Sequence, residues 1–222
     1  MKRKFERFLN NLEKVIFPGV GPYCIPQLKP EEYKPVEFIG FNYASQCRDY
    51  EGRGVHFFLD DYQFERIWTK FERNINMLCK FDAVLTPDWS MFVDWPTIVQ
   101  IWNHYRKHYV GAYLQMLGQT VYPSICWSDK KSFEWCFDGE PVGGCVAVSS
   151  VGTQMRKEEK QFFLYGYDAM LERLQPETIL FNGNIPSECR GNIVQMEEYQ
   201  RRLRKIEMGG DVDGGDNLHG LD

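Results

Sequence analysis

The hydrophobic positions of this chain follow two spacings, which alternate from one end of the sequence to the other. Short apolar runs bounded by turn residues predict buried strands. These runs lie at residues 36–41, 55–59, 83–86, 120–126, 144–150 and 178–181, with a weaker one at 192–196. Helices are expected between them, most on apolar residues spaced three and four apart. The expected helices lie at residues 5–16, 60–78, about 95–117, around 132–137, 163–174 and 197–207.

This alternation predicts parallel strands joined by right-handed crossovers, with helices covering the sheet. The expected fold class is α/β, with a mostly parallel sheet of six or seven strands. Two architectures stay open: an irregular or incomplete β/α barrel that is TIM-like, and an open doubly wound sheet. The barrel is favoured, because the strand count approaches eight and no G-x-G-x-x-G follows any strand.

The composition is that of a single globular domain. The 222 residues are 43% hydrophobic and 15% aromatic, which is enough to fill one substantial core. We expect residues 1–206 to form one α/β domain that opens with a helix. Residues 207–222, EMGGDVDGGDNLHGLD, hold five acids and no Lys or Arg. Such an acidic Gly/Asp tail is expected to be disordered.

Charge and cysteine content narrow the classes of partner and compartment. The net charge of −5 equals the five acids of the tail, so the rest of the chain is neutral and has no global basic field for nucleic acid. Local contacts to nucleic acid, and a small-molecule or nucleotide ligand, remain open. No long apolar run and no signal-peptide pattern is found, which indicates a cytoplasmic protein without a membrane partner. The seven cysteines lack any C-x-x-C pair and predict reduced thiols.

Three of the predicted strands run directly into acidic side chains. In chain order these are Asp60 and Asp61, then Asp88 and Asp94, then Asp129. In either architecture the loops after the carboxyl ends of the strands form one edge where ligands bind. Polar and aromatic residues of these loops should share that edge, and they are Tyr43, Trp89, Trp127, Ser128, Ser149, Ser150, Asn182 and Asn184.

Two carboxyl groups at such an edge can divide acid and base work. One in an apolar setting keeps its proton and donates it, while a solvated one stays ionised as base or nucleophile, and this is the chemistry that breaks glycosidic bonds. We assign Asp88 and Asp129 to that pair, with Asp61 as a third catalytic candidate. Trp89 and Trp127 offer flat faces for a sugar or a base. The other substrate-binding candidates are Tyr43, Ser128, Ser149 and Asn182.

Each of these residues also has a structural interpretation. An acid in a strand-to-helix loop often caps the next helix, which contributes about 1 kcal/mol, and Asp60, Asp94 and Ser132 fit that role. Asp61 could simply favour the positive end of its helix, and the two tryptophans could be ordinary core residues. The acids could instead hold Mg²⁺; no other cofactor is expected.

The histidines are interpreted as structural. His56 lies within a predicted strand as a core imidazole. His104 and His108 are four residues apart on the polar side of the long helix, and without the glutamate of an H-E-x-x-H motif they predict a solvated face and not metal ligands. Residues 149–157, SSVGTQMRK, suit either a phosphate at a helix N-terminus or a plain capped loop. No Walker spacing and no G-x-S-x-G motif is present.

Four segments carry a resemblance to a known family. They are GFNYA (40–44), GVHFFLDDYQFERIW (54–68), VLTPDWSMFVDWPTIVQIWNHYR (84–106) and VYPSICWSD (121–129). Over about residues 22–200 the chain resembles an uncharacterised family of phages and bacterial mobile elements, catalogued as a domain of unknown function. The resemblance implies a phage or prophage setting; it supplies no reaction and no catalytic residues.

Two functions therefore stay open. The first is a hydrolase or transferase that acts at a glycosidic bond of a nucleoside, a nucleotide or a nucleic-acid base, through Asp88 and Asp129. The second is a non-catalytic phage accessory protein that binds a nucleotide, DNA or a host protein, with the acids acting only as helix caps.

Overall fold

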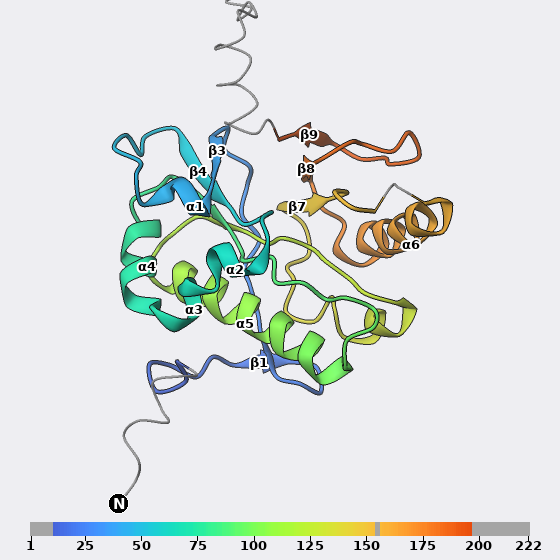
Figure 1. Cartoon of the computed structure of the whole chain (residues 1–222), viewed down its shortest axis with the longest axis horizontal. Helices are drawn as coiled ribbons and strands as arrows, with labels where there is room; N and C mark the ends of the chain where they lie inside the picture. The colour runs from blue at the N-terminus through green and yellow to red at the C-terminus, as the bar shows by residue number, and fades with distance from the viewer. Residues whose placement is uncertain (1–10, 154–155, 197–222) are drawn as a thin grey trace, which may run out of the picture.

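The computed structural model describes residues 11–153 and 156–196, which form two parallel β-sheets flanked by helices (Figure 1). The first sheet has the order β3 (Glu37–Gly40), β4 (Arg53–His56), β5 (Ala83–Leu85) and β6 (Val121–Tyr122). The second has the order β7 (Cys145–Ser149), β8 (Thr178–Asn182) and β9 (Ile193–Gln195). A short antiparallel ribbon precedes them, formed by β1 (Gly19–Val20) and β2 (Ile25–Pro26).

A single parallel bridge between Ser124 and Ala147 joins the two sheets. Beside it, the Ile125 amide donates to the Ala147 carbonyl at 2.7 Å, and the Ala147 amide donates to the Pro123 carbonyl at 2.8 Å. The strands from β3 to β9 thus follow one another in chain order, and every pairing along the row is parallel. The predicted α/β class with parallel strands is confirmed. Among the described residues no pairing joins β3 to β9, so a closed barrel is not shown.

Helices lie between most of the strands, as the spacing of apolar residues predicts. The longest are α5 (Thr97–Met116) and α6 (Lys157–Leu174), and both confirm predicted helices. The shorter ones are α1 (Phe41–Ala44), α2 (Asp61–Phe64), α3 (Arg66–Thr69), α4 (Phe71–Leu78) and the 3-10 helix η1 (Lys130–Glu134). Gly118, which has a φ of 85°, follows the end of α5 as expected for a glycine at a helix C-terminus.

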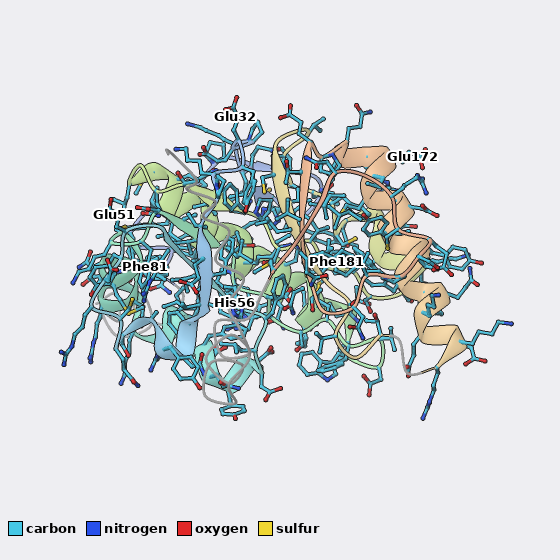
Figure 2. All side chains as sticks on the ribbon, turned by 90° about the horizontal axis from the view of Figure 1, so that it is seen from above. Glu32, Glu51, His56, Phe81, Glu172 and Phe181 are labelled. Atoms are coloured by element: carbon cyan, nitrogen blue, oxygen red, sulfur yellow. The ribbon has the colours of Figure 1, made fainter. Side chains whose placement is uncertain are left out.

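The apolar side chains of the strands alternate between two faces, and both faces are covered. On β7, Val146 and Val148 pack towards α6, whereas Cys145 and Ala147 point into a cluster that also holds side chains of the first sheet. This shared cluster contains Phe38, Ala83, Leu85, Tyr122, Leu180 and Met196. Figure 2 shows Phe81 and Phe181 among the packed side chains, with Glu51 and Glu172 at the outside of the molecule. Burial on both faces explains why the strands are continuous apolar runs.

Three predicted elements differ from the structure. The helix expected over 60–78 is split into α2, α3 and α4. Lys70 breaks it between α3 and α4, where it leaves the helical region with φ −123° and ψ 51°, whereas Glu65, between α2 and α3, keeps helical angles. The strand expected over 120–126 pairs at only two residues before Pro123, which has no amide hydrogen to donate. The short helix expected around 132–137 is a 3-10 helix that begins earlier, at Lys130.

Other predictions concern the two ends of the chain. The expected first helix begins among residues that lie outside the described part, and its described portion contains a turn at residues 12–14 and no helix. Ile16, the last residue of that expected helix, is 77% exposed. The expected helix at 197–207 and the acidic tail at 207–222 lie outside the described residues. None of the described helices is sufficiently long and apolar to cross a bilayer.

Candidate functional site

A cleft of about 440 Å³ lies at the carboxyl ends of the strands. The loops after β4, β5 and β6 contribute to its wall, together with the ends of β7 and β8. Its lining residues are Phe58, Leu59, Asp60, Gln63, Asp88, Trp89, Ser90, Met91, Phe92, Cys126, Trp127, Ser149, Val151 and Asn182. Segments that are far apart along the chain therefore meet at one edge, which is the arrangement that parallel strands impose.

Asp88 is the carboxyl group with the most perturbed setting in this cleft. It is partly buried in the loop after β5. The pKa of Asp88 is raised from 3.8 to about 6, mainly by desolvation and to a smaller extent by the nearby charge of Asp61. The Lys107 ammonium and a hydrogen bond from the Cys126 thiol oppose that shift. A carboxyl group with such a pKa can both donate and accept a proton near neutral pH.

Asp61 supports the loop that carries Asp88. It is the first residue of α2, and its Oδ1 accepts hydrogen bonds from the Ser90 hydroxyl at 2.9 Å and the Ser90 amide at 3.2 Å. Desolvation raises the pKa of Asp61, while the two Ser90 bonds and the charge of Arg106 lower it. Asp61 therefore binds Ser90, which lies two positions after Asp88, and these bonds bring Asp61 and Asp88 together.

Asp129 is placed differently from the other two candidates. It is the N-cap of η1, and its Oδ1 accepts from the amides of Lys131 at 3.0 Å and Ser132 at 3.1 Å. It is not among the residues that line the cleft. The structure does not bring Asp129 into a pair with Asp88; it gives Asp129 the geometry of a helix cap.

The other expected caps differ from the structure. Asp60 precedes α2 but makes no side-chain cap bond, and it lines the cleft instead. The N-cap of α5 is Pro96, so the exposed Asp94 has no capping role there. Ser132 lies inside η1, which Asp129 caps. The sequence predicts that some of these acids cap helices and that others face the cleft. It places Asp60 among the caps and Asp129 in the cleft, and the structure has the reverse.

The polar binding candidates are only partly gathered at the cleft. Ser149 and Asn182 are register partners on β7 and β8, and the Asn182 amide donates to Ser149 Oγ at 3.0 Å. Both line the cleft. Ser128 is buried and does not line it, although its hydroxyl is left without a partner. Tyr43, on α1, is 40% exposed and also lies outside the lining.

The two tryptophans have separate roles. Trp89 is 2% exposed, and its Nε1 donates to Glu65 Oε2 at 2.7 Å. The Arg106 guanidinium lies 4.1 Å from the centre of one of its rings, so the side chain is held as a core residue. Trp127 is only partly buried, lines the cleft, and packs against Phe163 with ring centroids 5.5 Å apart. Both tryptophans line the cleft, and Trp127 is the more exposed of the two.

The histidines of α5 contradict one expectation. His104 and His108 are 1% and 0% exposed, so the predicted solvated face is wrong. They lie beside Lys107, which is also buried and whose ammonium lies 2.5 Å from Glu140 Oε1. Burial lowers the pKa of Lys107, but neighbouring acidic groups more than offset this, and the net shift is upward. His56 is buried as expected, and desolvation lowers its pKa to about 4.

Sequence reasoning missed Lys107 and Glu140. The missed signal is the spacing of His104, Lys107 and His108, which places all three on one helix face. Among the described residues, the group of three or more metal-ligating side chains that gathers closely is His104, His108 and Glu140. The acids at the cleft do not form such a group, so the expected Mg²⁺ finds no cluster of ligands in the described part of the cleft.

Comparisons with known proteins give the family. The chain is 36% identical over 189 residues to the "Gene 1 protein" of Mycobacterium phage L5, covering 84% of this chain and 82% of that protein. It is 37% identical over 200 residues to the "Gene 1 protein" of Mycobacterium phage D29, covering 87% of this chain and 74% of that protein. No solved structure gives a significant match. Because the profile described as "Domain of unknown function (DUF4417)" matches residues 17–200, the chain belongs to that family.

Proposed function

We propose that this protein is an enzyme that acts at the glycosidic bond of a nucleoside, a nucleotide or a nucleic-acid base. The observation that carries the proposal is the Asp88 carboxyl group, which lines the cleft at the strand ends and has a pKa of about 6. A carboxyl group that exchanges its proton near neutral pH can protonate a departing base or activate an attacking water. In this proposal Asp88 is the catalytic residue.

Asp61 replaces Asp129 as the second carboxylate of the proposal. Its charge raises the pKa of Asp88, and its bonds to Ser90 hold the loop in which Asp88 lies. It acts through these contacts and is therefore a positioning residue. Asp129 caps η1, and the proposal gives it no part in the reaction.

The lining of the cleft suits a ligand with a flat ring and hydroxyl groups. Trp127, Phe58 and Met91 supply apolar surface, on which a base can stack. Ser149 and Asn182 supply a hydroxyl and an amide from adjacent strands. A volume of about 440 Å³ is within the usual range for small-molecule sites.

We infer that the seven strands form an incomplete β/α barrel that is TIM-like. Two features support this. The strands follow in chain order with no reversal, whereas a doubly wound sheet reverses its order at a switch point. One apolar cluster also collects side chains from both sheets, as the interior of a barrel does. A cleft of about 390 Å³, lined by residues of β3, β8 and β9, lies where closure would occur.

The enzyme proposal is tested by direct assay of base release. Purified protein is incubated with nucleosides, nucleotides and short DNA and RNA strands, and free base and sugar are separated by liquid chromatography. We expect one substrate class to be cleaved, with a loss of at least about 100-fold in Asp88→Asn. Asp129→Asn is the matched control and should retain activity. If no tested substrate is cleaved by the wild-type protein, or if Asp88→Asn is as active as wild type, the proposal is wrong.

A second candidate, a non-catalytic accessory protein that binds a nucleotide or DNA, is favoured by a different surface. A cleft of about 270 Å³ near α3 and α4 is lined by Arg66, Lys70, Arg73 and Lys80. Such a group of bases can contact phosphates even though the body of the chain is neutral. Fluorescence anisotropy of labelled DNA at several salt concentrations tests it. Lys70→Glu should weaken binding and flatten the salt dependence, while Asp88→Asn should change neither.

We propose a phage or prophage setting, in the cytoplasm of the infected cell, because the two relatives are proteins of mycobacteriophages. A host protein remains a candidate partner under the second function. Mg²⁺ is kept as a candidate at the cleft on two carboxyl groups alone, those of Asp60 and Asp88, which both line the wall. Adding a chelator to the base-release assay tests that part of the proposal.

A further inference from the structure

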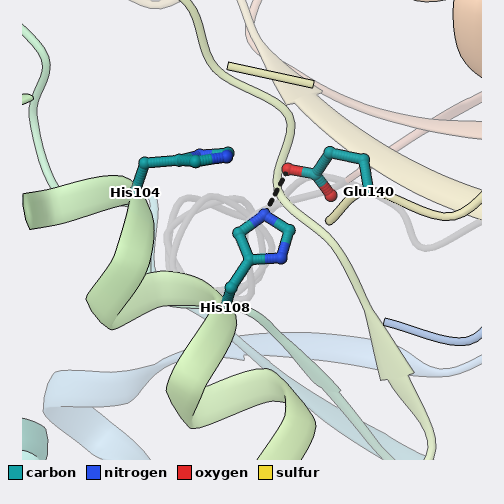
Figure 3. A group of neighbouring side chains, drawn as sticks. All are labelled: His104, His108 and Glu140. Carbon is teal, nitrogen blue, oxygen red and sulfur yellow. Dashed lines mark hydrogen bonds and ion pairs between the residues drawn. The ribbon is translucent and has the colours of Figure 1, made fainter. Parts of the chain in front are cut away.

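His104, His108 and Glu140 form a closed group beneath the sheet, separate from the residues that line the cleft. His104 and His108 are one turn apart on α5, and Glu140 lies in the turn that precedes β7. All three are at most 4% exposed. One ligand atom from each lies within 4.8 Å of the other two. Figure 3 shows both imidazole rings directed towards the Glu140 carboxylate.

The hydrogen bonds of the two rings decide which nitrogens carry protons. His108 Nδ1 lies 2.9 Å from the Pro26 carbonyl, and His104 Nε2 lies 2.9 Å from the Asp138 carbonyl. A carbonyl oxygen only accepts, so each of these nitrogens carries the hydrogen and donates. If both rings are neutral, the lone pairs lie on His108 Nε2 and His104 Nδ1. Anchoring the far nitrogen to a carbonyl is how proteins orient histidines that bind metals.

Two of the remaining acceptor atoms lack a donor. His104 Nδ1 and Glu140 Oε2 are buried without any hydrogen-bond partner. His108 Nε2 lies 3.0 Å from Glu140 Oε1, and two lone pairs at that separation repel unless a cation lies between them. Three acceptor groups thus converge on one buried place. The Lys107 ammonium contacts only Glu140 Oε1, so His104 Nδ1 and Glu140 Oε2 still need a partner.

The turn that carries Glu140 is packed tightly onto this group. A Cβ on Gly139, which has a φ of 78°, would lie 2.7 Å from His108 Nδ1 and 2.6 Å from the Pro26 carbonyl. A side chain there would displace both the ring and its anchor. The glycine therefore allows the turn to bring Glu140 against the histidines.

We propose that His104, His108 and Glu140 bind a divalent transition-metal ion of the Zn²⁺ type. Two imidazoles and one carboxylate are a ligand set that zinc accepts. Because the group is closed to solvent, the metal is structural. It ties α5 to the turn before β7, and through the Pro26 carbonyl the chain around β2 is held against the same ring.

The Lys107 ammonium is the main objection, since it lies 2.5 Å from Glu140 Oε1 and repels a cation. It also donates to the Ser124 carbonyl at 3.0 Å, on the side of the first sheet. Its bond uses Oε1 and leaves Oε2 for the metal. The alternative to a metal ion is a proton on His108 Nε2. It would satisfy the contact to Glu140 but leave His104 Nδ1 and Glu140 Oε2 without partners.

The test begins with the metal content of the full-length protein, purified without chelator or metal resin and measured by plasma mass spectrometry. We expect about one equivalent of one transition metal per chain. His104→Gln and Glu140→Gln should each lower it at least about tenfold, whereas His56→Gln, which changes another buried histidine, should retain it. Removal of the metal should lower the melting temperature, and Zn²⁺ alone should restore it.

If the ligand variants fail to fold, the wild-type protein keeps the proposal testable. Co²⁺ exchanged into it should give a visible absorption band that the metal-free protein lacks. Two results overturn the proposal. One is protein that folds without metal and gains no melting temperature with Zn²⁺, Mn²⁺, Fe²⁺ or Co²⁺, which leaves the proton as the shared charge. The other is metal retained equally by wild type and both ligand variants, which marks a surface contaminant.

Discussion

Replacing Asp88 by Asn should change how the stability of the protein depends on pH. Burial raises the pKa of Asp88 from 3.8 to about 6, a difference of about 2 pH units that corresponds to about 3 kcal/mol. The folded state disfavours the ionised form relative to the unfolded state. The stability contributed by Asp88 is therefore complete below about pH 4 and falls as the pH rises through about 6.

The effect is large enough to measure by urea unfolding. Between about pH 4.5 and about pH 7.5 the wild-type protein should lose about 2 kcal/mol of unfolding free energy relative to Asp88→Asn. Asp129→Asn removes one carboxylate from a neighbouring loop outside the cleft, so it corrects for the change in net charge. The comparison uses the difference between variants at each pH, because other groups titrate over the same range.

Parallel pH profiles for wild type and Asp88→Asn would refute the reasoning. They would mean that water or Lys107 compensates the buried charge completely. The carboxyl group would then have an ordinary pKa, and the main support for acid–base catalysis in the cleft would be lost. The absolute stability of Asp88→Asn does not decide the question, because the variant also loses its attraction to Lys107.

Three further substitutions test other parts of the structure. In metal-free protein, Lys107→Met should lower the stability by about 3–5 kcal/mol, since it leaves Glu140 as a buried charge without its ion-pair partner, and adding Glu140→Gln should cost less than the sum of the two single changes. Gly166→Ala should cost about 1–3 kcal/mol and shift tryptophan fluorescence, because its Cβ would lie 2.1 Å from Trp127 ring atoms. Trp89→Phe should cost about 1–2 kcal/mol through the lost bond to Glu65.

Denaturant unfolding measures all three, and each has an outcome that contradicts it. A cost below about 1 kcal/mol for Lys107→Met would show that Glu140 finds another partner. Gly166→Ala with unchanged stability and fluorescence would show that the Trp127 ring moves freely. Trp89→Phe should leave ligand binding in the cleft unchanged, so a large loss of affinity would show that this ring stacks on the ligand.

Much of the architecture could be predicted, because strands that are buried on both faces of a parallel sheet are continuous apolar runs in the sequence. β7 and β8 are apolar through most of their length, and α5 has the length and spacing of a single helix. The breaks are harder to predict. The split at Lys70 depends on a backbone conformation that Asn74 supports, by donating to the carbonyls of Arg66 and Lys70 at 2.8 Å. Such tertiary contacts outweigh the apolar spacing, which predicts one continuous helix.

The position of the cleft could be predicted from the sequence, but which of the nearby residues face it could not. Position after a strand brings Asp88, Ser149 and Asn182 to one edge whatever the loops do. Whether an acid caps a helix or faces the cleft depends on the direction of its loop, and here Asp129 turns back to the amides of Lys131 and Ser132. The loop conformation is set by contacts across the fold, which no local pattern records.

The buried face of α5 connects the two sites that are proposed. Lys107 lies between them, since its ammonium bonds to Glu140 and its charge acts on Asp88. One cation shared by two carboxylates stabilises each less than a dedicated partner would, and this helps to leave the pKa of Asp88 high despite a neighbouring base. A helix that presented only apolar side chains would pack as well, yet it would leave Asp88 without any counter-charge. The Lys107 ammonium on the polar face of α5 therefore acts as counter-charge to both Glu140 and Asp88.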